Sequence, residues 1–558
     1  MTIVNMGREA VPSRALPHTP EAGDPYYIGD CYDRSDVPSE WEVDAREMPY
    51  LMHIKVLSES WKPLRYLADF MEVGTTPLRW KDFKAGFKDE RQERVQRTEV
   101  TYLKYSHSGK ATSMPLKTAD ALRACVSNLT SLPSDSGSTH VLVVEDLSRD
   151  TIEILGSAFD IDPFFFREQI DEYSWYNTRD PWANPPGLTA AMRSRNWLRI
   201  RNIRLHHFGS KGEFKEAQQQ SNSFNVLRRP DDDQNHWHYM DKPGSIVSLT
   251  RTKTSIWTGN TGKDGDISIG IVLVDPTITA GTPLWYGHSN WQPPPSMHAE
   301  GATTTPPTSP SLYNEILNKT SSYPWFMPRL QNPSSSKGII AKPAMYAAAA
   351  EWLIVCDYMK ARLGQIEWEL EKPGTFRSRG DVIDASLHRL HVWRRVIPVY
   401  REMVTETLEQ AVPAAARLLP LAPPVPNLIE TLTGAFEDIA QDFRRVQNAL
   451  NELQARVDRL TSIVTAEISI EDSRRGLQEN HNLARLTWMA TTFIPLSFVT
   501  GLFSMQNNIA DMRETFGWYF LTALPLTIAV LVGANRVGRG WRLRKKANGG
   551  DKKSKKSE

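Results

Sequence analysis

The sequence is poor in the features that mark most enzymes and nucleic-acid-binding proteins. Its 558 residues include only three cysteines, Cys31, Cys125 and Cys356, which lie far apart in the chain. That spacing fits no metal site and no disulfide framework, and it favours a reducing compartment. The 66 Lys and Arg residues nearly balance the 65 Asp and Glu residues. Because nothing in the overall charge favours nucleic acid, we expect no nucleic-acid partner.

The sequence also lacks a nucleophile elbow, a phosphate-binding glycine loop and an HExxH pattern, so we expect no enzyme, no catalytic residue and no cofactor. Histidines are the remaining candidates for a metal site: His206 and His207 are adjacent, and His236 and His238 follow Asp231–Asp233. Alternating histidines on a strand share a face, so such a site is geometrically possible. Because the aspartates lie among Pro, Gln and Asn, as in a solvated loop, we favour structural histidines. Metal-ligating residues therefore stay unknown.

Charged residues are missing from two stretches near the C-terminus, Leu486–Ala510 and Phe516–Asn535. Each is long enough for the roughly 20 apolar residues that cross a bilayer. A buried hairpin is the alternative, but the chain after Asn535 is rich in Lys and Arg. By the positive-inside rule this tail is cytoplasmic, and two crossings place the N-terminal part there as well. We predict an integral membrane protein in contact with lipid. The N-terminus has no apolar core of signal-peptide type, so we expect the first span to direct membrane insertion.

The first half of the chain alternates between strand and helix signals. Ser148 is a good helix N-cap, and Asp162–Pro163 is a second helix start. Period-two alternation or short apolar runs predict strands at Thr98–Tyr105, His140–Val144, Trp197–His207, Gly244–Trp257 and Ile267–Val274. We therefore predict a mixed α/β domain with one sheet and covering helices.

Helical periodicity takes over in the second half. Apolar residues at intervals of three and four predict one helix through Met345, Ala349, Trp352, Cys356, Met359, Leu363, Ile366 and Leu370. A second helix, antiparallel to it, is expected from about Asp381 to Val412. A longer stripe predicts a coiled-coil-like stalk whose apolar face needs other helices; it comprises Phe436, Ile439, Phe443, Val446, Leu450, Leu453, Val457, Leu460 and Val464.

The predicted organisation has nine parts, and its fold class is an α/β cytoplasmic domain with a long helical stalk and two C-terminal transmembrane helices. The parts are a partly disordered N-terminal region (1–47), the α/β domain (48–290), a flexible insertion rich in Pro, Ser and Thr (291–340), the antiparallel helix pair (341–412), the stalk (427–485), transmembrane helix 1 (486–505), an outer loop (506–515), transmembrane helix 2 (516–535) and a basic cytoplasmic tail (536–558).

Three stretches of sequence together with this architecture resemble the CorA superfamily of divalent-cation channels. FIPLSFVTGLFSMQNN is similar to the end of that family's first span, where a Gly-Met-Asn signature follows. Phe516–Phe520 resembles the aromatic start of its second span, and Val143–Phe166 resembles the fungal CorA-like branch. The signature itself departs from the pattern, because Ser504 stands in place of glycine and Gln506 in place of asparagine, with Met505 between them.

The resemblance implies a homopentamer that moves a divalent cation, with Mg²⁺ the first candidate, and that senses intracellular Mg²⁺ between subunits. It implies a path lined by the first span, with an outer mouth at Ser504, Met505 and Gln506. Residues at intervals of three or four lead to that mouth along one face of the span: Leu483, Leu486, Ala490, Ile494, Ser497 and Gly501. Asp511 and Glu514 in the outer loop would attract cations. The same face could instead point to lipid, and the alternative function is a non-conducting, membrane-anchored scaffold or sensor on the same fold.

Overall fold

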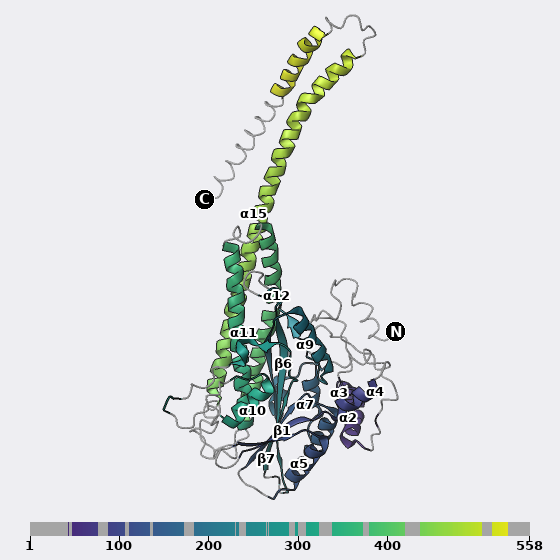
Figure 1. The fold of residues 1–558 in the computed structure, drawn as a ribbon, viewed down its shortest axis with the longest axis vertical. Helices are drawn as coiled ribbons and strands as arrows, with labels where there is room; N and C mark the ends of the chain where they lie inside the picture. Colours follow the sequence, from purple (N-terminus) through teal and green to yellow (C-terminus); the bar gives the residue numbers. More distant parts are fainter. Residues whose placement is uncertain are drawn as a thin grey trace. The chain divides into compact units, whose positions relative to one another are not determined.

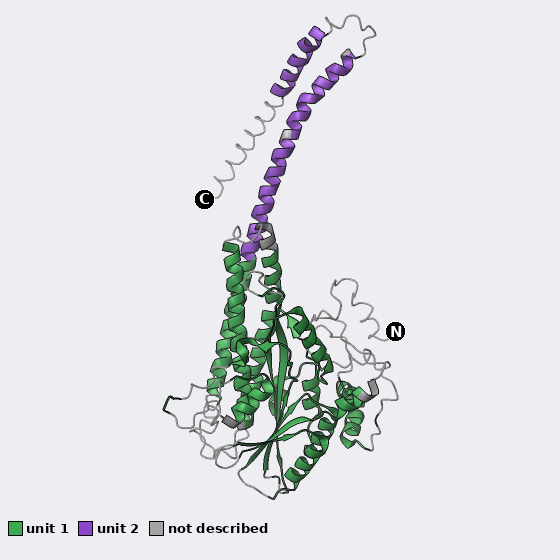
Figure 2. Cartoon of the chain, viewed as in Figure 1, with its two compact units in different colours: residues 1–461 green, residues 462–558 purple. Residues whose placement is uncertain are grey.

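The computed structural model describes residues 43, 47–75, 87–105, 111–133, 138–171, 184–228, 230–233, 242–263, 265, 267–288, 296–298, 308–322, 338–371, 379–418, 436–504 and 516–533. The chain divides into two compact units, residues 1–461 and residues 462–558 (Figure 2). Each unit has its own internal packing, so the two are described separately.

The first unit is built on a mixed sheet of eight strands with the order β2-β1-β3-β7-β6-β4-β8, and β5 pairs with β6 (Figure 1). The β3–β7 pair is parallel, whereas the other pairs are antiparallel. The strands are β1 (Glu99–Tyr105), β2 (Ala111–Leu116), β3 (Thr139–Glu145), β4 (Trp197–Phe208), β5 (Pro230–Asp232), β6 (Ile246–Thr261), β7 (Ile267–Val274) and β8 (Thr282–Pro283). The predicted α/β domain is confirmed.

All five predicted strands are present, as β1, β3, β4, β6 and β7. Strand β2 was missed because ATSMPL contains Pro115 and is largely exposed. Proline cannot donate to a ladder, and it is tolerated on an edge strand such as β2. The sequence pattern reveals strands that are buried on at least one face, and short or edge strands escape it.

One face of the sheet is covered by helices from the N-terminal half of the unit. Alternate residues of β7, Ile269, Ile271 and Leu273, lie in the main core cluster with Phe165 and Phe166. The helices of this half are α2 (Pro49–Ser60), α3 (Leu64–Val73), α4 (Phe87–Gln96), α5 (Ala119–Ser131), α6 (Arg149–Phe159), α7 (Pro163–Ile170), α8 (Thr189–Ser194) and α9 (Lys211–Ser223), and a short 3₁₀ turn, η5, covers Leu284–Gly287.

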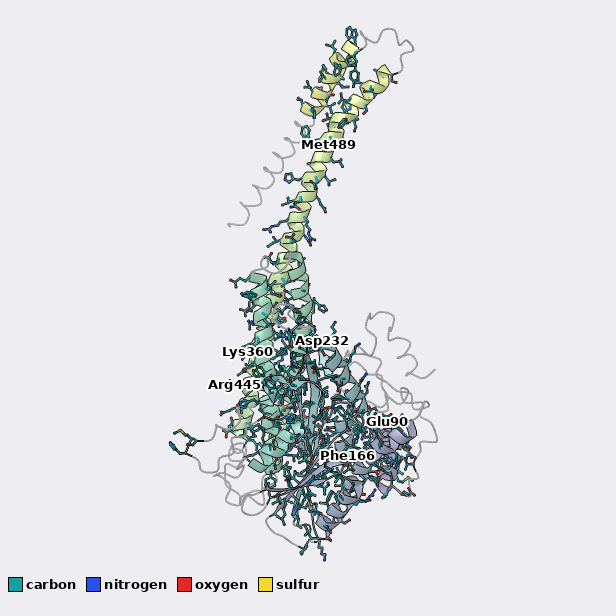
Figure 3. The ribbon with its side chains drawn as sticks, in the orientation of Figure 1. Glu90, Phe166, Asp232, Lys360, Arg445 and Met489 are labelled. Atoms are coloured by element: carbon teal, nitrogen blue, oxygen red, sulfur yellow. The ribbon has the colours of Figure 1, made fainter. Side chains whose placement is uncertain are left out.

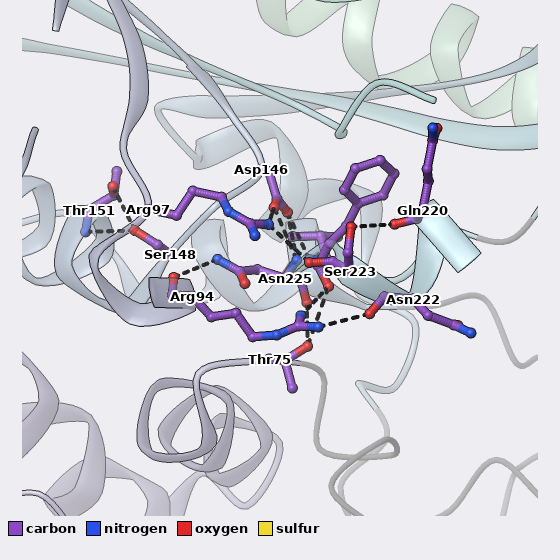
Figure 4. Close-up of polar contacts among 12 residues, drawn as sticks. Thr75, Arg94, Arg97, Asp146, Ser148, Thr151, Gln220, Asn222, Ser223 and Asn225 are labelled. Atoms are coloured by element: carbon purple, nitrogen blue, oxygen red, sulfur yellow. Dashed lines mark hydrogen bonds and ion pairs between the residues drawn. The ribbon is translucent and has the colours of Figure 1, made fainter. Parts of the chain in front are cut away.

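The two predicted helix starts are confirmed by their caps. The Ser148 hydroxyl accepts from the Thr151 backbone N–H at 3.3 Å and begins α6, and the Asp162 carboxylate accepts from Phe164 N–H at 2.9 Å and begins α7. Asp146 lies at the turn between β3 and α6 and has a left-handed φ of 51°. Its buried carboxylate accepts from the Asn225 and Val226 backbone N–H groups and from Arg97 (Figure 4).

The opposite face of the sheet is covered by α10 (Leu312–Ser322) and α11 (Gly338–Glu371). Gly270 of β7 has no side chain on this face, and a Cβ there would lie 2.5 Å from Ile340. A flexible insertion was predicted at 291–340, but part of this range forms the helix α10. Its residues Leu312 and Ile316 are buried in the first unit. Two apolar residues one turn apart bury a short helix that the Pro- and Ser-rich surroundings concealed.

The predicted helix pair is α11 with α12 (Arg379–Glu406), which contains Pro398 and continues as a π-helical turn, η8 (Thr407–Ala411), and α13 (Val412–Arg417). The helix α15 (Glu437–Phe503) starts beside this pair (Figure 1). Its Arg456 bonds Glu367 of α11, and its Gln447 donates to Thr405 of α12 at 2.9 Å. The stalk stripe from Phe436 to Leu460 is at most 4% exposed. Partners for that stripe are therefore provided within one chain.

The second unit contains the rest of α15, from Ser462 to Phe503, and a helix at Phe516–Gly533. Among the described residues, this 18-residue helix is the one that is long and apolar enough to cross a membrane, and 11% of it is buried. The uncharged run that starts at Leu486 is helical as far as Phe503. The structure therefore supports one candidate span among the described residues, in the second run, and the first span stays a prediction.

Candidate functional site

The candidate site is the C-terminal part of α15. Backbone N–H and C=O groups in an apolar run must be satisfied within the helix, and polar side chains need partners too. The threonine hydroxyls achieve this by donating to carbonyls one turn earlier: Thr487 to Leu483, Thr491 to Thr487, Thr492 to Trp488 and Thr500 to Leu496, at 2.7–2.9 Å. Pro495 removes one backbone N–H from the ladder inside this run.

The two helices of the second unit pack through small and hydroxyl-bearing residues. The Thr500 and Tyr519 hydroxyl oxygens are 3.1 Å apart. Val499 is 4% exposed beside Thr500, and Ala523 and Thr527 are 1% and 7% exposed on the other helix. Tyr519, Ala523 and Thr527 are four residues apart, so they share one face of their helix. That face and the Val499 side of α15 form the contact.

The predicted path residues lie on the other side of α15. At about 100° per residue, Ser497 and Gly501 are nearly opposite Val499. Leu483, Leu486 and Ile494 are 59%, 62% and 67% exposed. A Cβ added at Gly501 meets nothing within 4 Å, and Ser497 and Ser504 are exposed as well. The label of Met489 in Figure 3 shows where this part of α15 lies. One face, turned away from the second helix, thus carries these six residues.

The remaining predicted site residues fall outside the described part of the chain. These are Met505 and Gln506 of the mouth and Asp511 and Glu514 of the outer loop, together with His236 and His238. Ser504 directly follows α15, and its backbone N–H donates a helical hydrogen bond to the Thr500 carbonyl at 2.9 Å. Within the described ranges, no group of three or more His, Cys, Asp or Glu side chains could hold a metal ion.

Of the adjacent candidate histidines His206 and His207, His206 lies in the core of the first unit. It is 3% exposed and stacks on Phe208 at 6.3 Å between ring centroids. Burial, and then the nearby Arg204, lower the pKa of His206 to about 3, so the imidazole is neutral. A structural histidine was the favoured interpretation, and its burial agrees with that. Its polar surroundings on the same sheet face were not apparent from sequence.

Comparison with known proteins gives a family match and distant structural likenesses. Residues 310–535 match the family described as CorA-like Mg²⁺ transporter protein. The full-length CmaX protein is 11% identical with a TM-score of 0.40, over 80% of this chain and 98% of that one. The CorA magnesium transporter from Methanocaldococcus jannaschii is 9% identical with a TM-score of 0.36, over 77% and 96% of the two chains. No curated protein matches.

The matched segment begins just before α10 and extends through α11, α12 and α15 to the end of the second apolar helix. It therefore includes the whole candidate site and the helices of the first unit that pack beside the start of α15. Over residues 310–535, the chain is thus similar to the family described as CorA-like Mg²⁺ transporter protein.

Proposed function

We propose that this protein is a membrane channel or transporter for divalent cations, with Mg²⁺ as the first candidate ion. The observation that carries the proposal is the family match over residues 310–535, which includes both apolar helices. The proposed path runs along the face of α15 that bears Leu483, Leu486, Ile494, Ser497, Gly501 and Ser504.

The packing of the second unit supports this choice of face. The helix Phe516–Gly533 contacts the Val499 and Thr500 side of α15, and the proposed path face is exposed among the described residues of the second unit. Leu483, Leu486 and Ile494 would form apolar rings that gate by dewetting, and Ser497 would supply hydroxyl groups. Rings require several copies of the chain, and we propose a homopentamer on the resemblance to the family.

The outer mouth would consist of Ser504, Met505 and Gln506. Mg²⁺ loses its hydration shell reluctantly, so neutral oxygen acceptors that bind the shell are a suitable first contact. The Gln506 amide provides such an acceptor on a side chain one methylene longer than asparagine. Asp511 and Glu514 would raise the local cation concentration. With two spans and a basic tail, both termini and the first unit would be cytoplasmic.

A second candidate function is a non-conducting membrane scaffold or sensor. The specific observation in its favour is the changed signature, with Ser504 in place of glycine and Gln506 in place of asparagine. Serine at the helix end has less access to positive φ than glycine, and a longer amide is held less rigidly. Both changes weaken the geometry of an ordered ring of amide groups.

The test is Mg²⁺ uptake into liposomes that contain the purified oligomer and an internal Mg²⁺-sensitive dye. Wild type is compared with Gln506→Ala and with Gln478→Ala, a matched control on the exposed part of α15. We expect uptake by wild type and by Gln478→Ala, and a loss of uptake in Gln506→Ala. A correctly assembled wild-type oligomer that transports nothing under an inward gradient would instead support the scaffold.

Reversion of the signature separates the two functions further. The double variant Ser504→Gly/Gln506→Asn restores the family pattern. A protein that already conducts will show uptake before the reversion, whereas a scaffold will show it only afterwards or not at all. The same dye measurement on matched amounts of oligomer distinguishes these results.

A further inference from the structure

A row of polar side chains lies buried between β4 and β6, on the sheet face covered by α10 and α11. Three directly opposite pairs form this polar row: Asn202 with Thr252, Arg204 with Thr250, and His206 with Ser248. All six side chains are at most 8% exposed. A sheet face packed under helices is normally apolar, because buried polar groups are costly unless they are hydrogen-bonded.

Most of the polar row lacks a hydrogen-bond partner among the described residues. The atoms concerned are Arg204 Nε, both ring nitrogens of His206, both amide atoms of Asn202, Ser248 Oγ and Thr250 Oγ1. Ser309 Oγ, next to the row, also lacks a hydrogen-bond partner among the described residues. Thr252 is the exception, since its hydroxyl donates to the Asn202 carbonyl at 3.2 Å. Unpaired buried groups in such number are rare in folded proteins and point to a bound partner.

A small cavity adjoins the row. Its volume is about 20 Å³, and its lining includes Arg204, His206 and Thr250 of the row together with Asp275, Thr277 and Leu312. This volume is enough for one or two water molecules or one small ion. Three residues of the row that carry unpaired atoms, Arg204, His206 and Thr250, therefore line this cavity, which we name the Arg204 cavity.

The charges around the cavity favour an anion. The Arg204 guanidinium donates to the Ser309 carbonyl at 3.3 Å, and its Nε is 3.8 Å from the Glu351 carboxylate, too far for a hydrogen bond. The Asp275 carboxylate is occupied by Arg228, Gln169 and the Lys253 backbone N–H, each at 2.6 Å. The Arg204 guanidinium thus keeps an N–H available for an anionic ligand, and Asp275 does not.

We propose that the Arg204 cavity binds a small monatomic anion of chloride size. Arg204 supplies the positive charge and one N–H, and the neutral His206 and the Thr250 hydroxyl supply further donors. A cation is disfavoured by the adjacent guanidinium, and the cavity holds no carboxylate without a partner. Bound anion would join β4, β6 and the α10 segment at one point of the first unit. This inference stands independently of the proposed transport function.

Anion binding is expected to depend on the protonation of Glu351. Arg204 of β4 and Glu315 and Lys319 of α10 face this carboxyl, which is buried on α11. Burial raises the pKa of Glu351 to about 7, against the opposing effects of Arg204 and Lys319. Below pH 7 Glu351 is neutral and leaves Arg204 free to attract the anion. Above pH 7 its charge competes, so binding weakens as pH rises.

The experiment is ³⁵Cl NMR line broadening on the full-length protein in detergent. Saturable broadening that bromide displaces is expected for wild type at pH 6. Thr250→Val keeps the side-chain volume and removes one donor, and Arg204→Met removes the charge. Each should weaken chloride binding about tenfold or more, as loss of a hydrogen bond to a charged group does. Arg123→Met, at an exposed arginine paired with Asp120, should bind as wild type does.

Circular dichroism checks that each variant is folded, and Thr250→Val carries the test if Arg204→Met unfolds. Glu351→Gln provides a second reading, because its chloride binding should no longer change between pH 6 and pH 8. Wild type without saturable broadening would mean that the cavity holds ordered water only, and the proposal would be wrong. Unchanged binding in folded Thr250→Val and Arg204→Met would also overturn it.

Discussion

The hydroxyl groups of Thr500 and Tyr519 lie 3.1 Å apart and join the two helices of the second unit. Thr500 already donates its hydrogen to the Leu496 carbonyl at 2.8 Å. Tyr519 must therefore be the donor in the contact between the helices, and Thr500 the acceptor. This contact also fixes the rotation of α15, because it places Thr500 and Val499 toward the second helix and the predicted path face away from it.

Loss of this hydrogen bond should loosen the helix pair. Tyr519→Phe removes the donor and Thr500→Val removes the acceptor, each with little change of volume. Interhelical hydrogen bonds in membranes contribute about 0.6 kcal/mol on average and rarely more than about 2 kcal/mol. A double-mutant cycle on the detergent-solubilised protein, followed by denaturant unfolding, should give a coupling energy of this size. Additive effects of the two substitutions would show that the hydroxyl groups do not interact.

Asp146 should be essential for the corner between β3 and α6. Asp146→Ala leaves the Asn225 and Val226 N–H groups and the Arg97 guanidinium without their acceptor. It also places alanine at φ 51°, where asparagine and aspartate are tolerated better. We expect a loss of about 2–5 kcal/mol in the free energy of unfolding, and a smaller loss for Asp146→Asn. Asp120→Ala, at an exposed ion pair, is the control and should change it by less than about 0.5 kcal/mol.

Gly270 should be sensitive to the addition of a single methyl group. A Cβ at this position of β7 lies 2.5 Å from the Ile340 side chain at the start of α11. Gly270→Ala should therefore cost about 1–3 kcal/mol through overpacking. The double variant Gly270→Ala/Ile340→Ala makes room for the methyl group and should cost less than the sum of its two single changes. Equal or greater loss in the double variant would argue against direct contact.

Glu351 should give the first unit a pH-dependent stability. Its folded pKa of about 7 lies above the ordinary value of 4.5. Below pH 4.5, Glu351 is protonated in the folded and the unfolded protein, and its full contribution to the free energy of unfolding is present. Between pH 4.5 and pH 7 only the unfolded protein releases the proton, so the free energy of unfolding falls. Above pH 7 both release it, and the decrease levels off. Relative to Glu351→Gln, wild type should lose on the order of 3 kcal/mol across this window. Denaturant titrations of both proteins at pH 4.5, 6 and 8 measure the difference. If the free energy of unfolding changed equally with pH in wild type and Glu351→Gln, the raised pKa of Glu351 would be wrong.

Long apolar patterns were predicted well because they report local periodicity. The five strands from β1 to β7 that carry alternating or continuous apolar residues were found, as were the stripes of α11 and α15. The caps at Ser148 and Asp162 were recognised for the same reason, since a cap and its helix are neighbours in sequence. The edge strand β2 was missed because it contains Pro115 and is largely exposed, and the helix α10 was missed because its burial depends on partners in other elements of the first unit.

The sequence by itself determined the type of each long helix and strand and the two uncharged runs, and it contained the segment that matches the CorA-like family. Periodicity places residues on a face without saying what that face meets. Only the tertiary structure decided that the stalk stripe is covered by α11 and α12 of the same chain. It also decided that Val499 rather than Ser497 faces the second helix, and that the polar row gathers around Arg204. These outcomes depend on contacts between residues tens to hundreds of positions apart, and such contacts are set by packing and desolvation rather than by local pattern.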